Sequence, residues 1–237
     1  MQQIRERLEK ELKNLFEGEV CRNCDASKYS CEKDAVCKDH AVKIGRKYGE
    51  KIKVLIIGKE SKCKHCSVQE PENFETQNNQ HYRRTYDILN YLINDVDIEE
   101  YNGYQHVSEK ELSNLHEYFA LTNEYHCFFG TKAHGRKTFG NMWDSCAKIV
   151  QKEIEILDPD IIVIQEAWST KNGAEKYIKK LLKPEENLKK VENGLYSFEH
   201  NGKTGWIIGS HHPSYNLWHQ KSLKELKERL IKIKEAK

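Results

Sequence analysis

The sequence lacks any long apolar run, any marked excess of one charge and any internal repeat. No hydrophobic stretch approaches the ~18 residues that a membrane span needs, and residues 1–16 have the spacing of an amphipathic helix rather than of a secretion signal. The 39 Lys and Arg residues nearly balance the 37 Asp and Glu residues. The resulting net charge of +2 excludes strong attraction of the whole molecule to nucleic acid or anionic lipid, so a basic surface has to be local. We therefore expect a cytoplasmic protein that has no contact with a membrane.

The length of 237 residues lies between one large domain and two small ones. We predict a single domain and a monomer. In this prediction residues 1–48 form a helix and a cysteine-rich, metal-binding segment, and residues 49–237 form an α/β core.

Short apolar runs alternate with segments of helical spacing along the chain. The apolar runs predict strands at residues 53–58, 118–122, 160–165 and 205–209, with 53–58 as the first strand of the sheet and a polar hairpin before 205. The helical spacing predicts helices at residues 3–16, 82–93, 108–117, 143–157, 173–183 and 223–233. Strands that alternate with helices predict an α/β fold, in which helices cover both faces of an open, mostly parallel sheet.

Three of the predicted strands run into unusual polar segments. These are GKES at 58–61, TNEYHC at 122–127 and GSHHPSY at 209–215. Ligands of open α/β sheets bind beyond the carboxyl ends of the strands, so we expect the three segments to converge on one pocket.

The eight cysteines are better explained by metal binding than by disulfides, because the chain has no secretion signal. Cys21, Cys24, Cys31 and Cys37 have spacings that could close a local zinc site by themselves. The pair Cys63 and Cys66 is a Cys-x-x-Cys that is either unligated or redox-active. Two further cysteines, at 127 and 146, stand alone, and small buried hydrophobic residues would also account for them.

The three polar segments, in this order and on these strands, resemble the uracil-DNA glycosylase superfamily. That family has a first motif after strand one, an Asn at the exit of a central strand and a His-Pro-Ser type loop near its end. The resemblance covers residues 12–220 approximately. It implies a three-layer α/β/α domain that hydrolyses the N-glycosidic bond of uracil or another modified base, in DNA repair or in defence against modified foreign DNA.

The resemblance assigns roles to two residues of the later segments. His212 would stabilise the negative charge that builds on the departing base, and Asn123 would read the Watson–Crick edge of a base flipped out of the helix. In plainer interpretations Asn123 caps a turn, and His211 and His212 are surface histidines in a turn.

The first motif departs from the family pattern. It reads Gly58, Lys59, Glu60 and Ser61, without the usual Pro, and a Cys-x-x-Cys follows it. Glu60 occupies the position of a water-positioning acid, although a capping or ion-paired glutamate is an equally good interpretation. This departure favours a base other than plain uracil.

Further residues would contact DNA. Lys132, His134, Arg136 and Lys137 lie between the two isolated cysteines, and Arg83 and Arg84 begin a predicted helix, although such charge runs are often only solvated surfaces. Pro213 and Ser214 would shape the loop against a phosphate. Leu217 or Trp218 would fill the gap left by the base, and Phe74 or Tyr82 would stack on the base, although these aromatic residues are more plainly explained as parts of the core.

The positions of four cysteines resemble the iron-sulfur branch of the family. This resemblance implies a [4Fe-4S] cluster held by Cys21, Cys24, Cys127 and Cys146, with Cys31 and Cys37 as alternative ligands. Zinc would accept the same four thiolates. Two alternatives to a glycosylase stay open, namely a nucleic-acid-binding protein of this fold without catalysis and a metal or redox protein that uses Cys63 and Cys66.

Overall fold

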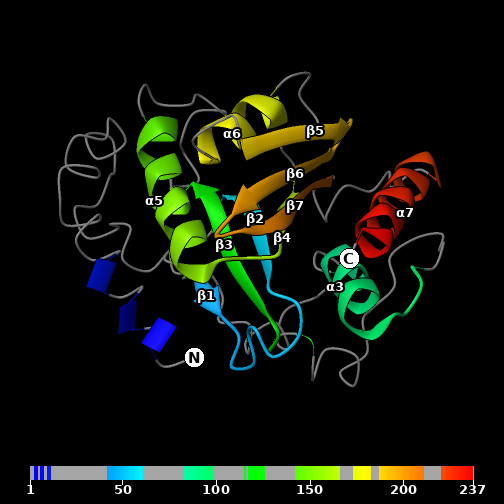
Figure 1. Cartoon of the computed structure of the whole chain (residues 1–237), viewed down its shortest axis with the longest axis horizontal. Helices are drawn as coiled ribbons and strands as arrows, with labels where there is room; N and C mark the ends of the chain where they lie inside the picture. The colour runs from blue at the N-terminus through cyan, green and yellow to red at the C-terminus, as the bar shows by residue number, and fades with distance from the viewer. Residues whose placement is uncertain are drawn as a thin grey trace, which may run out of the picture.

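The computed structural model describes residues 3–4, 6–7, 10–11, 42–60, 83–98, 115, 117–125, 142–165, 173–182, 187–210 and 220–236. Within these ranges the chain forms one seven-stranded sheet and four helices (Figure 1). The strands are β1 (Lys43–Ile44), β2 (Val54–Glu60), β3 (Phe119–Tyr125), β4 (Ile161–Gln165), β5 (Leu188–Glu192), β6 (Leu195–His200) and β7 (Lys203–Ser210). The helices are α3 (Arg83–Asn94), α5 (Met142–Leu157), α6 (Gly173–Leu181) and α7 (Gln220–Glu235).

The sheet combines a parallel centre with antiparallel edges. Its strand order is β1-β3-β2-β4-β7-β6-β5, and the four strands β3, β2, β4 and β7 run parallel to one another. At one edge β1 pairs antiparallel with β3, and at the other edge β7, β6 and β5 form an antiparallel meander. The predicted α/β class is confirmed, as is the polar hairpin before residue 205.

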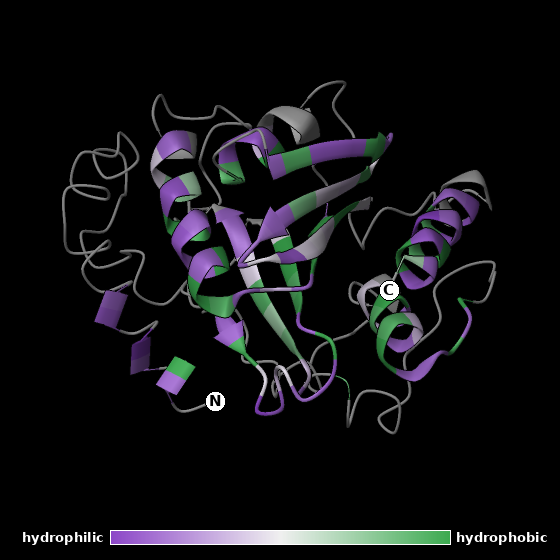
Figure 2. Cartoon of the chain, viewed as in Figure 1, coloured by the Kyte–Doolittle hydropathy of each residue, from purple (hydrophilic) through white to green (hydrophobic). Residues whose placement is uncertain are grey.

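Two hydrophobic cores lie on opposite faces of the sheet, because successive strand residues point to opposite faces. Leu55 and Ile57 of β2 belong to the core under α5 and α6, whereas Val54 and Ile56 belong to the core under α3 and α7. Figure 2 shows the apolar strands in the middle of the molecule and polar residues along the outer sides of the helices. Helices therefore cover both faces of the sheet, as the alternating pattern predicted.

The strand predicted at residues 53–58 is present as β2, but the prediction that it is the first strand of the sheet was wrong. The short strand β1 precedes β2, and Val42 and Tyr48 are buried in the core, so residues before 49 already contribute to the sheet. Two residues of strand are too few to produce an alternation that a sequence pattern could reveal. The predicted helix at 108–117 lies almost wholly outside the described residues. None of the described helices is long and apolar enough to cross a membrane.

A buried glutamate joins β1, β3 and α5. Glu153 of α5 has no exposed surface, and its carboxylate accepts hydrogen bonds from the Val42 backbone N–H at 3.1 Å and from the Thr122 hydroxyl at 2.7 Å. A buried carboxylate is tolerated only when hydrogen bonds replace its lost hydration. This contact therefore ties α5 to the edge of the sheet that carries β3.

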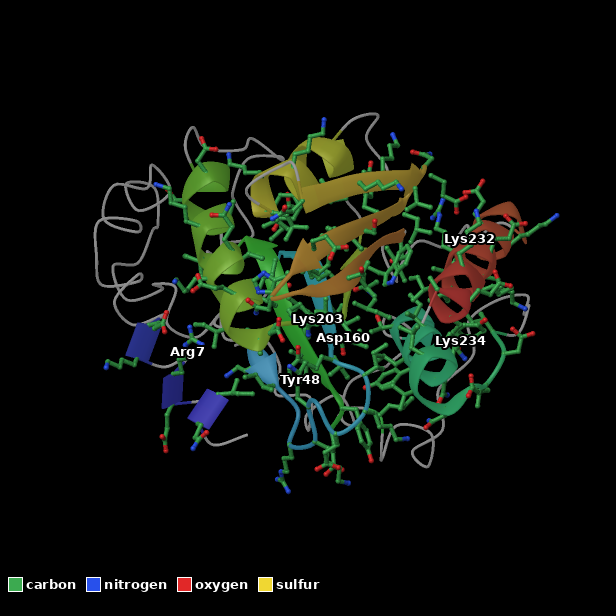
Figure 3. All side chains as sticks on the ribbon, in the orientation of Figure 1. Arg7, Tyr48, Asp160, Lys203, Lys232 and Lys234 are labelled. Atoms are coloured by element: carbon green, nitrogen blue, oxygen red, sulfur yellow. The ribbon has the colours of Figure 1, made fainter. Side chains whose placement is uncertain are left out.

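The amino ends of three parallel strands are joined by a charged cluster that we call the amino-edge cluster, formed by Lys53, Asp158, Asp160 and Lys203. Lys203 Nζ lies 2.8 Å from Asp158 Oδ2 and 3.0 Å from Asp160 Oδ1. Lys53 donates from its Nζ to Asp158 and from its backbone N–H to Asp160 Oδ2 at 2.9 Å. Figure 3 shows Lys203 and Asp160 side by side at this edge of the sheet. The cluster links the first residues of β2, β4 and β7.

These contacts change the acid–base properties of Asp158. Its partial burial alone would raise the pKa, but hydrogen bonds from Lys203, Asn201 and Lys53 outweigh burial and lower the pKa below its ordinary value of 3.8. A carboxyl group whose folded pKa is lowered stabilises the fold above its unfolded pKa, and this contribution disappears as the pH falls through the folded value.

We predict that Asp158→Asn is less stable than the parent at pH 7 by about 1 kcal/mol, since solvent screens a partly exposed cluster. The difference should shrink as the pH falls below about 4, where Asp158 of the unfolded chain takes up a proton, and it should disappear once the pH falls through the lower pKa of the folded state. Urea unfolding of both proteins between pH 2 and 7 measures this difference in the free energy of unfolding. Asp95→Asn is the matched control, because Asp95 also has a positive φ and an ion pair, with Lys234, but its side chain is 85% accessible, so solvent screens that pair. A constant difference between parent and Asp158→Asn from pH 7 to pH 2 would contradict the prediction.

Candidate functional site

The register of the parallel strands places four residues in one row at the carboxyl edge of the sheet. Gly58 of β2 pairs with Asn123 of β3, and Gln165 of β4 pairs with Ser210 of β7. Because Ile57 pairs with Ile164, Gln165 is the next residue on the other side of Gly58. All four positions continue the alternation of the core under α3 and α7, so they face that side of the sheet. We call them the carboxyl-edge row.

Asn123 lies in the strand ladder and not in a turn, which corrects the interpretation of this residue as a turn cap. The prediction that 122–127 is a loop was wrong over its first part, because β3 continues to Tyr125 and pairs there with Glu60. β2 likewise continues through Glu60, so the predicted loop 58–61 begins later. Strand pairing satisfies the backbone of these polar residues, and the sequence of one strand does not reveal its partner.

The Asn123 side chain occupies the space above Gly58. A Cβ atom at position 58 would lie 2.8 Å from Asn123 Oδ1, which is closer than non-bonded atoms tolerate. Asn123 is half-buried, and no hydrogen bond joins its amide to any residue that the structure describes. An amide in this position can offer both a donor and an acceptor to a ligand.

Gln165 is a site residue that the sequence analysis missed. It ends the buried strand β4 and is 5% exposed, and its Nε2 donates to the hydroxyl of Thr85 at 2.6 Å. Thr85 lies in the first turn of α3, so this bond brings the amino end of the helix to the carboxyl-edge row. The signal in the sequence was a polar residue at the end of a wholly apolar strand.

Arg229 of α7 holds the end of β7. Its guanidinium donates to the carbonyl of Gly209 at 3.1 Å and lies over Gly194, where a Cβ atom would come within 2.5 Å of it. Burial lowers the pKa of Arg229, while Glu225, Glu192 and Glu228 act in the opposite direction. Arg229 therefore positions the last residues of β7, from which the segment with His212 continues.

The structure brings some of the predicted residues together and leaves others outside its description. Gly58 and Asn123 are adjacent, Glu60 ends β2 at the same edge, and Arg83 and Arg84 begin α3 beside the row. The side chains of Glu60, Arg83 and Arg84 are outside the described part. So are all of these predicted residues: Ser61, Phe74, Tyr82, Lys132, His134, Arg136, Lys137, His212, Pro213, Ser214, Leu217 and Trp218.

Of the cysteines, the described ranges contain Cys146 alone, which is buried on α5 and is not in a disulfide. The end of α5 lies at the amino edge of the sheet, where Asp158 contacts Lys53. Cys146 precedes Leu157 by three turns, about 16 Å, and so lies toward the carboxyl edge. Among the described residues no His, Cys, Asp or Glu side chains gather in a group of three that could hold a metal. The predicted ligands Cys21, Cys24 and Cys127, with Cys31 and Cys37, lie outside these ranges.

We predict that Gly58→Ala displaces the Asn123 amide, because the new methyl group takes its place. The side-chain amide signals of Asn123, assigned in heteronuclear NMR spectra by comparison with Asn123→Ala, should shift, while the stability changes by only about 1 kcal/mol, since a flexible side chain can move aside. Gly202→Ala is the control for the NMR signals only: its Cβ would meet nothing within 4 Å, so the Asn123 signals should not shift, whereas its positive φ strains an alanine and lowers the stability. Unshifted Asn123 signals in Gly58→Ala would show that the two residues are not in contact.

The carboxyl-edge row thus consists of the side-chain amides of Asn123 and Gln165 and the hydroxyl of Ser210, beside Gly58. The chain continues from these strands into the polar segments in which the sequence predicts further site residues. No protein-family model matches the chain, and no curated protein matches it either.

Proposed function

We propose that the chain is a monofunctional DNA glycosylase, which hydrolyses the N-glycosidic bond of uracil or another modified base flipped from DNA. The observation that carries the proposal is the half-buried Asn123 amide beside Gly58 at the carboxyl edge. This is the edge at which open α/β sheets bind ligands, and an amide is suited to reading a pyrimidine or purine edge. The order of the three polar segments, which resembles the uracil-DNA glycosylase superfamily, supports the same function.

In the proposed reaction, water attacks C1′ of the sugar while the bond to the base nitrogen breaks and its electron pair leaves with the base. His212 donates a hydrogen bond to the base oxygen on which negative charge develops. Glu60 orients the water and accepts its proton, and it also offsets the positive charge that develops on the sugar. β7 supports this assignment of His212, because it ends at Ser210 in the row and the chain continues from there.

DNA binding would use basic residues around the carboxyl edge. Arg83 and Arg84 support this assignment, because they begin α3 beside Gln165. The other predicted contacts, Lys132 and Arg136, follow the end of β3 in the chain. Cations near the row would bind phosphates on either side of the flipped base, and such contacts position DNA without reading its sequence.

The position of Cys146, the one cysteine among the described residues, is compatible with a [4Fe-4S] cluster. Cys146 is buried, is not in a disulfide, and lies toward the edge where β3 ends, two residues before Cys127. Cys21, Cys24, Cys127 and Cys146 would hold the cluster as four thiolates. When bound, the cluster would pin the N-terminal segment to α5 and to the exit of β3. Zinc would do the same with the same ligands.

We predict that His212→Ala binds substrate DNA almost normally but excises the base ~100- to 1000-fold more slowly. The reason is that the hydrogen bond from His212 strengthens only as charge develops on the base. The expected loss of rate corresponds to an increase of about 3 to 4 kcal/mol in the activation free energy. Single-turnover excision and equilibrium binding, measured on oligonucleotides with different modified bases, test this. His211→Ala is the matched control and should retain the parental rate. A parental rate in His212→Ala would remove the catalytic role of this loop.

The same oligonucleotides separate the glycosylase from a binding protein that lacks catalysis. The unusual first motif, with Lys59 and Glu60 where the family has a Pro nearby, favours this alternative. Selective binding by the parent protein without release of any base would establish it.

We predict that protein prepared without oxygen is brown, because charge transfer from thiolate to iron absorbs visible light. Cys146→Ser should be paler and less stable, whereas Cys63→Ser should keep the colour, since Cys63 is outside the proposed ligand set. Absorbance and metal analysis measure both effects. Colourless protein with one zinc per chain would contradict the cluster and leave the fold unaffected.

A further inference from the structure

The strongest unassigned feature is the buried amide of Gln165 at the centre of the carboxyl-edge row. A side-chain amide carries two N–H donors and a carbonyl acceptor, and a buried one needs partners for both ends. In the described part of the chain, the one hydrogen bond of the Gln165 side chain is to Thr85, and it satisfies one end only. The carbonyl oxygen of Gln165 is not one of the wholly buried polar atoms that lack a partner, so it is open to water or to a ligand.

Thr85 holds this amide without dictating its orientation. A hydroxyl group both donates and accepts, so it can bond to the amide nitrogen or, after a flip of the amide, to the amide oxygen. Gln165 can therefore present either its carbonyl or its N–H2 group to a ligand. Thr85 itself is 2% exposed and lies in the first turn of α3, which makes it a rigid support.

Asn123 and Gln165 flank Gly58 on the same face of the sheet. Their backbones are two strand spacings apart, about 10 Å, and the residue between them carries no side chain. Two uncharged amides on either side of a glycine suit a ligand with neighbouring donors and acceptors. A phosphate or a carboxylate would use only the N–H2 groups and would leave both amide carbonyls without a donor, so it matches the pair less well.

We infer that Gln165, positioned by Thr85, is a second specificity-determining amide, and that with Asn123 it selects an uncharged nucleobase with a donor and an acceptor side by side. This class comprises lactam edges, as in uracil and hypoxanthine, and amidine edges, as in cytosine and adenine. The inference rests on the proposed function and deepens it, since it names the ligand edge that the site reads.

The test uses binding, which does not require excision. Dissociation constants are measured for single-stranded oligonucleotides that carry one central uracil, hypoxanthine, cytosine, adenine or abasic site. The selectivity of the parent is defined as the dissociation constant for the abasic oligonucleotide divided by the dissociation constant for the oligonucleotide with the best base. Gln165→Met keeps the length of the side chain but has no strong hydrogen-bonding group, and it should reduce this ratio about 10-fold, the effect of one hydrogen bond.

Two further variants keep the inference testable if Gln165→Met does not fold. Gln165→Glu, assayed at pH 8, has acceptors only and should change the preference about 10-fold in favour of bases with an amino group. Thr85→Val should lower the selectivity because the amide is no longer held, whereas Thr85→Ser, which keeps the hydroxyl, should match the parent. Thermal unfolding of each variant identifies those that are folded.

The outcomes separate the inference from the proposed function. Folded variants at position 165 with parental selectivity would overturn the inference, even if the parent excises a base. A parent that binds one base selectively, loses selectivity in Gln165→Met and excises nothing would support the inference and remove the proposed function. A parent that does not distinguish any base from an abasic site would overturn both.

Discussion

The hydrogen bonds of Asp160 are the constraint on which the rest of the sheet depends. Its backbone N–H donates to the carbonyl of Lys53, its carbonyl accepts from Trp206, and its carboxylate binds both the Lys53 backbone and the Lys203 ammonium. One residue before β4 thus connects the strands on either side of it. Because the side-chain period of a strand is two residues, a shift of one residue would turn every side chain to the other face. The amino-edge cluster therefore determines which residues can meet at the opposite end of the sheet.

The carboxyl-edge row is the consequence of that register. Gly58, Asn123, Gln165 and Ser210 come from four strands that are far apart in the chain. They share one face because the amino-edge cluster holds β2, β4 and β7 in register and ladder pairing holds β3 to β2. Helices complete the arrangement from both sides. Glu153 holds α5 against β3, whereas Thr85 and Arg229 hold α3 and α7 at the ends of β4 and β7. The charged contacts that hold the strands in register thus lie at one edge, and the polar side chains of the row lie at the other.

Most elements could be predicted from the sequence because their signals are local. The apolar runs at β2 and β4 and the helical spacing of α5 each depend on neighbouring residues only, and the structure has all three where they were expected. Asn123 and Gly58 were singled out because they lie in polar segments at the ends of predicted strands, and the resemblance to a known family gave Asn123 its proposed role. Gln165 and Arg229 were missed, because the role of each depends on a hydrogen-bond partner in another element. Gln165 donates to Thr85, and Arg229 donates to the carbonyl of Gly209. β1 was missed because it has two residues only.

The sequence by itself determined the α/β class, the parallel central strands and the polar segments that follow them, since hydrophobic periodicity and strand length are properties of the chain alone. Only the tertiary structure decided that β2 and β3 extend through their polar ends, that Asn123 lies over Gly58, and that a buried Gln165 stands on the far side of that glycine. The physical reason is that ladder hydrogen bonds and close approaches are made between strands, where residues distant in the sequence satisfy each other's polar groups. A pattern along one strand contains no information on which strand lies beside it.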